Sequence, residues 1–204
     1  MNRRTALLVA ALPLLLAACG GASSTSSTHV MPDGTTMSGS TMNQMDHSGR
    51  AGDMTGDDGQ GAGPSQAASM ICGREIRDAV AHTLQIRTAP RGLHSYGHRL
   101  FRCSYLLHAG ELRLSVKDLD TPGPGPAYFE ALRSRLPGAE GLTGVEALGF
   151  PSFQTPHGDV AFLKDHKTLW VDASRLRVMS LPSGMTRTEV AYGVAAAVVA
   201  CWTE

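Results

Sequence analysis

The sequence lacks two features that place many proteins in a class at once, a membrane-spanning apolar run and a net charge. Its longest apolar run, residues 6–16, is shorter than the roughly 20 residues that a helix needs to cross a bilayer. Lysine and arginine total 18 residues, aspartate and glutamate also total 18, and no segment is strongly basic. This composition lacks the basic surface that binds nucleic acid, so we expect no nucleic-acid partner.

Enzyme motifs are missing as well. The sequence has no Gly-x-Ser-x-Gly elbow, no His-Glu-x-x-His pair and no glycine-rich phosphate loop. His94 and His98 have a spacing that suits zinc only on a helix, and the glycines around them predict a polar loop instead. We therefore expect a protein that is not an enzyme. The alternative is a hydrolase, which would need serine, histidine and carboxylate groups that converge in one pocket.

Residues 1–18 have the organisation of a bacterial export signal. Arg3 and Arg4 form a positive start, residues 6–16 form a short apolar segment, and small residues lead to Cys19. Leu16-Ala-Ala-Cys19 resembles the lipobox of bacterial lipoproteins. The resemblance implies cleavage before Cys19, diacylglycerol on its sulfur and anchorage at the extracytoplasmic face of the cell membrane. An ordinary secretory signal is the alternative, and either the Sec or the Tat route fits the two arginines.

Residues 19–68 have few of the apolar residues from which a folded core is built. Within residues 19–68, leucine, isoleucine and aromatic residues are absent, and Val30 is the one β-branched apolar residue. Such a segment cannot bury enough apolar surface to offset the entropy of ordering it. We expect a disordered tether with an average span of roughly 40 Å between the lipid and a folded domain at residues 69–204.

Methionine is unusually frequent in this polar tether, although it is normally a core residue. Thioethers select Cu(I) over hard cations, and imidazole also suits copper. The segment resembles the methionine-rich segments of exported copper-handling proteins. The candidate Cu(I) ligands are His29, Met31, Met37, Met42, Met45 and His47. A plain tether is the alternative, in which methionine is tolerated or consumes oxidants, because the uneven spacing defines no rigid site.

Residues 69–204 show the hydrophobic periods of a folded α+β domain. Period-four spacing predicts helices, period-two alternation predicts strands, and Thr186-x-x-Glu189 predicts a capping box at the start of the last helix. The expected order is α-β-β-α-β-β-α, with about four strands in a mainly antiparallel sheet and helices packed on one face. The expected helices are 72–84, 128–136 and 186–201, and the expected strands are 101–107, 112–117, 160–162 and 169–171.

This domain resembles the small sensor-like domains of actinobacterial surface lipoproteins and of some mycobacterial kinase ectodomains. The matching features are Cys72, Cys103-x-Tyr105, Val145-x-x-Leu148-Gly149 and an alanine-rich last helix. From the residues alone, Cys72, Cys103 and Cys201 allow one bridge in three ways. The resemblance implies the Cys72–Cys103 pairing.

Two functional hypotheses remain open at this point. In the first, the domain binds a ligand and the tether handles copper. In the second, the protein is an envelope sensor or accessory lipoprotein that binds a partner protein or small ligand, and its methionines are incidental. Any small-molecule groove is expected between helices and sheet, where such pockets form.

Overall fold

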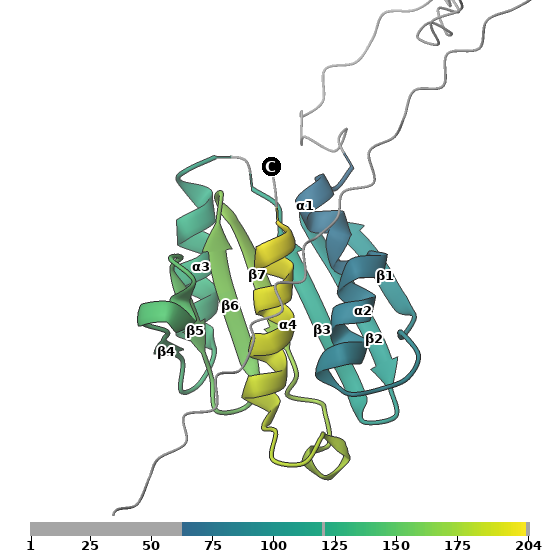
Figure 1. Cartoon of the computed structure of the whole chain (residues 1–204). Coiled ribbons are helices and arrows are strands. Elements are labelled where there is room, and N and C mark those ends of the chain that lie inside the picture. Colours follow the sequence, from purple (N-terminus) through teal and green to yellow (C-terminus); the bar gives the residue numbers. More distant parts are fainter. Residues whose placement is uncertain (1–62, 120, 203–204) are drawn as a thin grey trace, which may run out of the picture. The chain divides into compact units, whose positions relative to one another are not determined.

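The computed structural model describes residues 63–119 and 121–202 (Figure 1). The predicted export signal, Cys19 and the candidate copper ligands lie outside the described residues. Within the described residues, no helix has the length and apolar character that crossing a membrane requires.

The described residues form an α+β fold, as expected. The helices are α1 (Gln66–Ser69), α2 (Arg74–Thr83), α3 (Pro124–Arg135) and α4 (Arg187–Cys201), with short 3-10 turns η1 (Met70–Cys72), η2 (Gly144–Ala147) and η3 (Val178–Ser180). The strands are β1 (Gly92–Gly97), β2 (Leu100–Leu107), β3 (Gly110–Lys117), β4 (Glu140–Gly141), β5 (Ser152–Gln154), β6 (Asp159–Lys164) and β7 (Lys167–Asp172).

All seven of these strands join one antiparallel sheet in the order β1-β2-β3-β7-β6-β5-β4. The expectation of about four strands is therefore wrong, and so is the element order built on it. The four expected strands correspond to β2, β3, β6 and β7, which form the centre of the sheet. The other strands escaped notice because β4 and β5 have only two and three residues, and β1 is exposed along nearly its whole length, with no buried alternation.

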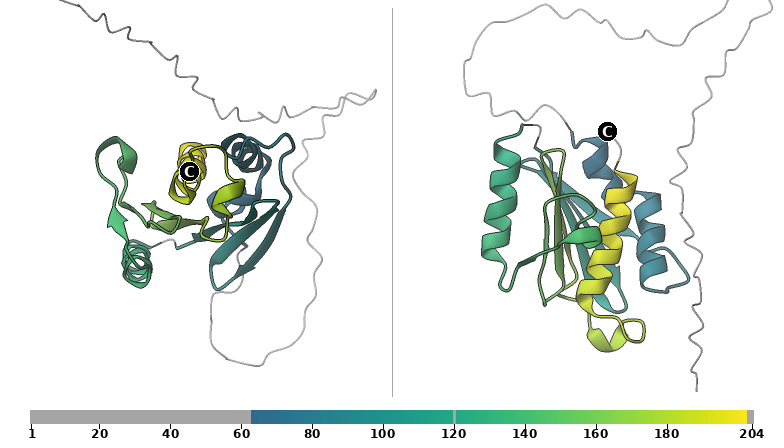
Figure 2. Two further views of the ribbon diagram at one scale, coloured as in Figure 1. Left: turned by 90° about the horizontal axis from the view of Figure 1, so that it is seen from below. Right: turned by 60° about the vertical axis from the view of Figure 1, so that its left-hand side comes forward.

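Helices cover both faces of the sheet, not one face as expected (Figure 2). We call the face under α2 and α4 the inner face and the face that carries α3 the outer face. The inner face holds the large core, to which α4 contributes Val190, Val194 and Val198. On the outer face, Phe129 and Leu132 of α3 pack against Phe153 and Ala161 of the sheet in a separate small core.

Local sequence explains where the two later helices begin. The Thr186 side chain accepts a hydrogen bond from the Glu189 amide at 3.1 Å, and the Glu189 carboxylate accepts one from the Thr186 amide at 2.6 Å. This is the expected capping box, and it starts α4. Helix α3 has proline in its first turn, and its Gly125 lies against the β6–β7 turn. A Cβ there would lie 2.2 Å from the carbonyl oxygen of His166, so only glycine allows this close approach.

The chain enters the fold through α1, which begins before the expected domain boundary at Ser69. The Ser65 side chain caps α1 by accepting a hydrogen bond from the Ala68 amide at 3.1 Å. The Ser65 amide donates to the buried carboxylate of Asp118 at 2.7 Å. Asp118 therefore fixes the start of α1 beside the end of β3.

Candidate functional site

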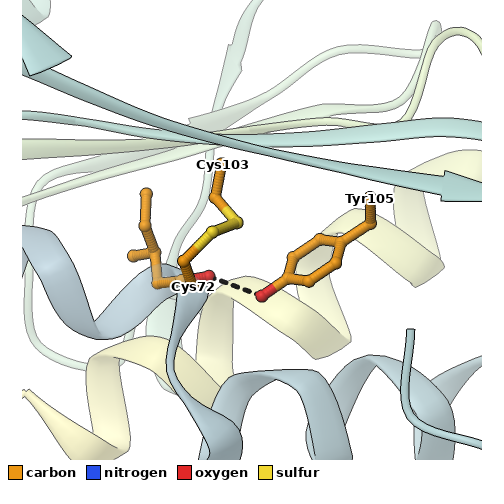
Figure 3. The surroundings of a disulfide bond; sticks show 4 residues. Cys72, Cys103 and Tyr105 are labelled. Carbon is orange, nitrogen blue, oxygen red and sulfur yellow. Dashed lines mark hydrogen bonds between the residues drawn. A yellow bond between two sulfur atoms is a disulfide. The ribbon is translucent and has the colours of Figure 1, made fainter. Parts of the chain in front are cut away.

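A disulfide joins Cys72, at the end of η1, to Cys103 in β2 (Figure 3). The Cα atoms are 5.5 Å apart and Cys103 is completely buried, so the bond ties the helical layer to the inner face of the sheet. This is the pairing that the resemblance implies. Because the cysteines are 31 residues apart, the cross-link contributes roughly 4 kcal/mol in the chain-entropy model.

Two neighbouring residues fit closely around the disulfide. The buried Tyr105 hydroxyl donates a hydrogen bond of 2.7 Å to the Ile71 carbonyl (Figure 3), and burial raises the pKa of Tyr105. Gly92 of β1 leaves no room for a side chain, because a Cβ would lie 2.6 Å from each sulfur atom. These contacts make the disulfide a structural bond that is packed on several sides.

The outer face of the sheet carries a groove of about 250 Å³ where no helix covers it. Its lining residues come from β1, β2, β3 and β7, which pair in that order. We call this the sheet-face groove. We expected a groove between helices and sheet, and two hollows of about 190 and 350 Å³ do lie beside α4. The sheet-face groove instead lies on the face opposite α2 and α4.

Strand register builds the sheet-face groove from two rows of directly opposite residues. The first row is Ser95, Arg102, Ser115 and Trp170. The second row is Leu93, Ser104, Arg113 and Asp172. Residues opposite one another in such rows have Cβ atoms about 4.5–5.5 Å apart, so each row forms a continuous surface across four strands.

Trp170 lies at the boundary between the groove and the part of the outer face that α3 covers. It is half-buried, lines the groove and also packs against the small core beneath α3. Its indole nitrogen donates a hydrogen bond of 3.0 Å to Asp159, and the Thr155 hydroxyl donates one of 2.7 Å to the same carboxylate. This buried carboxylate fixes the orientation of the indole ring at the edge of the groove.

An ion-pair network occupies one end of the groove. The Arg113 guanidinium donates two hydrogen bonds to Glu111, at 2.8 and 2.9 Å, and Arg175 donates one at 3.0 Å. The hydrogen bond from Arg113 is the main reason why the pKa of Glu111 lies below its ordinary value, and Glu111 in turn raises the pKa of Arg113. Glu111 and Arg113 therefore neutralise each other, and Arg175 adds a second cation beside them.

Arg102 differs from Arg113, although both side chains face the groove. Arg102 is exposed and makes no hydrogen bond or ion pair with any residue that the structure describes. Its neighbours across β1 and β3 are the hydroxyl side chains of Ser95 and Ser115. The centre of the groove therefore presents a positive charge between two hydroxyl groups.

The two histidines of the predicted polar loop lie in different elements of the fold. His94 belongs to β1, so the loop prediction is wrong there, and its ring stacks on Phe101 with centroids 5.7 Å apart. His98 lies in the β1–β2 turn with a φ of 50°. The described part of the chain contains no group of three histidine, cysteine or carboxylate side chains that could hold a metal ion. The six candidate copper ligands and Cys19 are outside this part.

Sequence reasoning did not identify Arg102 and Trp170 as site residues. Alternation in β2 indicates that Arg102 faces away from Cys103, which is a usable signal. It cannot show which residues of β1, β3 and β7 lie beside Arg102, because pairing between distant strands determines that. No known family model, no characterised protein and no solved structure matches the chain.

Proposed function

We propose that this protein is a lipoprotein held at the extracytoplasmic face of the cell membrane by lipid on Cys19, with a folded domain that is a non-enzymatic binding module. The sheet-face groove carries the binding role. A concave surface that combines hydroxyl, guanidinium and indole groups can both orient a ligand and bury its apolar part. The ligand is a small molecule of the envelope or an exposed segment of an envelope protein.

The disulfide supports an extracytoplasmic location. Disulfides persist in oxidising compartments and are rare in the reducing cytosol. The Cys72–Cys103 bond crosses two layers of the domain and is packed by Tyr105 and Gly92. The lipobox-like sequence before Cys19 supports the same location independently.

Anchorage is tested with the full chain in a bacterial host, by membrane fractionation and by mass spectrometry of the N-terminal peptide. We expect the protein in the membrane fraction with diacylglycerol on Cys19. The Cys19→Ser variant should lose the lipid, whereas the Ser23→Ala variant should keep it. Wild-type protein without lipid, recovered from the soluble fraction, would contradict the proposal.

Copper handling by the tether is a second proposed function, favoured by the concentration of soft ligands in residues 29–47. The mature chain, residues 19–204, is titrated with Cu(I) against a competing chelator. Replacement of Met31, Met37, Met42 and Met45 by leucine should abolish binding. The matched control is Met179→Leu, because Met179 is fully exposed on the folded domain. Unchanged binding in the fourfold variant would refute this function and leave the methionines incidental.

A further inference from the structure

The charged side chains that line the sheet-face groove differ in whether they have a hydrogen-bond or ion-pair partner. Glu111 is bound by Arg113 and Arg175, and Asp172 accepts hydrogen bonds from the Ser174 amide and hydroxyl at 2.9 and 2.5 Å. Arg102 has no such partner among residues 63–119 and 121–202. Arg102 is therefore the only charged side chain of the groove lining that has no hydrogen-bond or ion-pair partner among these residues, and its charge is positive.

The hydrogen-bonding groups around Arg102 suit a planar anion. Ser95 and Ser115 stand directly opposite Arg102 on the two neighbouring strands. A guanidinium presents its N–H groups in a fixed fork that matches the two oxygens of a carboxylate. The hydroxyl groups can donate to the same oxygens. Ser115 is 8% exposed and lies on the floor of the groove, whereas Ser95 and Arg102 are exposed to solvent.

The carboxylates at the other end of the groove limit the charge of the ligand. Glu111 and Asp172 both line the groove, and a dianion such as a phosphate monoester would be repelled by them. A monoanion that contacts Arg102 is attracted by the guanidinium and is repelled less strongly by the two carboxylates. The electrostatics therefore favour a carboxylate over a phosphate monoester.

The apolar groups of the groove indicate what accompanies the carboxylate. Trp170 lies in the same row as Arg102, with Ser115 of β3 between them. Two strand spacings, about 9.5 Å, separate the backbones of β2 and β7, and Arg102 and Trp170 line the groove on the two sides of β3. Leu93, which is 62% exposed, forms an apolar border on β1. One aromatic ring or branched alkyl group fills the distance from Arg102 to the indole.

We propose that the sheet-face groove binds a small organic monoanion, with its carboxylate on Arg102, Ser95 and Ser115 and its aromatic or branched apolar body against Trp170. This inference rests on the proposed binding function and names the ligand class of the same groove. The carboxylate belongs either to a free organic acid or to the C-terminus of a peptide, and both present the same chemistry to Arg102.

The test uses the mature chain, residues 19–204, and three matched probes: N-acetyl-phenylalanine, its neutral amide and phenyl phosphate. Binding is followed by NMR through the indole N–H of Trp170, which Trp170→Phe identifies. We expect the acid to shift this signal with an affinity about tenfold or more above that of the amide and above that of the phosphate. A peptide ending in phenylalanine, compared with the acid, distinguishes the two carboxylate sources.

Arg102→Gln should weaken binding of the acid about tenfold or more, and Arg102→Lys should weaken it less. Arg74→Gln is the matched control, because the Arg74 side chain is 83% exposed on α2 and belongs to the opposite face. Equal binding of acid and amide at Trp170 would overturn the ligand class while leaving the groove a binding site. Shifts confined to residues outside the groove, or an unchanged affinity in Arg102→Gln, would overturn the site itself. Neither result depends on lipid at Cys19.

Discussion

The inner and outer faces of the sheet are made by the same strands but are covered differently. On the inner face, α2 and α4 cover the large core, and a disulfide joins this layer to β2. On the outer face, α3 covers the part around Phe153 and Ala161, while the part around Arg102 is open. The same strands therefore bury one face in the core and leave part of the other face uncovered by helices.

The same contrast runs along the outer face itself. Where α3 covers it, the sheet presents apolar side chains such as Phe153, which is completely buried. Beyond Trp170 most of the lining side chains are hydroxyl and charged groups, with Leu93 as an exposed apolar border. Because a large exposed apolar patch would favour aggregation, a mainly polar lining is suited to a part of the sheet that no helix covers.

The largest expected effect comes from breaking the covered part of the outer face. Phe153→Ala should lower the free energy of unfolding by about 3–5 kcal/mol, because a fully buried ring leaves a cavity beneath α3. The matched variant is Phe162→Ala on the inner face, where the ring is 1% exposed. Urea denaturation of both variants measures the two costs. A loss below about 1 kcal/mol in Phe153→Ala alone would show that α3 contributes little to the fold.

Removal of the disulfide tests how strongly the inner face is cross-linked. The Cys72→Ala/Cys103→Ala variant should lose roughly 4 kcal/mol of stability, since its unfolded chain is no longer restricted. Thermal unfolding followed by circular dichroism, with and without a reductant, provides the measurement. The reductant should lower the melting temperature of wild type by more than that of the double variant, because only wild type has the Cys72–Cys103 bond to lose. Equal stability of oxidised wild type and double variant would contradict the structural role.

Tyr105→Phe tests the hydrogen bond beside the disulfide with a smaller change. The variant keeps the ring but leaves the Ile71 carbonyl without its donor, which should cost about 1–3 kcal/mol. Tyr96→Phe is the control, since Tyr96 is 38% exposed at the sheet edge. Urea denaturation should show a larger loss of unfolding free energy for Tyr105→Phe than for Tyr96→Phe. If the two losses are the same, the buried hydroxyl contributes nothing specific.

The smallest effect is expected from the ion pairs of the open part. Arg113 holds the pKa of Glu111 below its ordinary value of 4.5, so the folded state binds this proton less tightly than the unfolded state. The stabilisation is present above pH 4.5 and is lost as the pH falls through the lower folded-state pKa. Compared with Glu111→Gln, wild type should be more stable near neutral pH by about 1 kcal/mol or less, and this difference should disappear in acid.

Melting temperatures of wild type and Glu111→Gln between pH 2 and pH 7 would show this convergence. The control is Glu130→Gln, an exposed change on α3, whose melting temperature should follow that of wild type across the whole pH range. A Glu111→Gln curve that also stays parallel would mean that the pair does not stabilise the fold.

Elements with a strong local pattern could be predicted from the sequence. Alternation identified β2 and β3, and the capping residues identified the start of α4. Strand β1 escaped because it is an edge strand whose side chains are almost all exposed, so no hydrophobic alternation marks it. The side of the sheet on which α3 packs was also missed, because a helix pattern shows that one face is apolar but not which surface it meets.

For this protein, the sequence by itself determined the α+β class, the four central strands and the last helix, because each depends on periodicity or capping within a short segment. Only the tertiary structure decided that Arg102 stands between Ser95 and Ser115 with Trp170 beyond them. Those residues come from four strands, and their positions depend on strand order and register, which arise from contacts between distant parts of the chain.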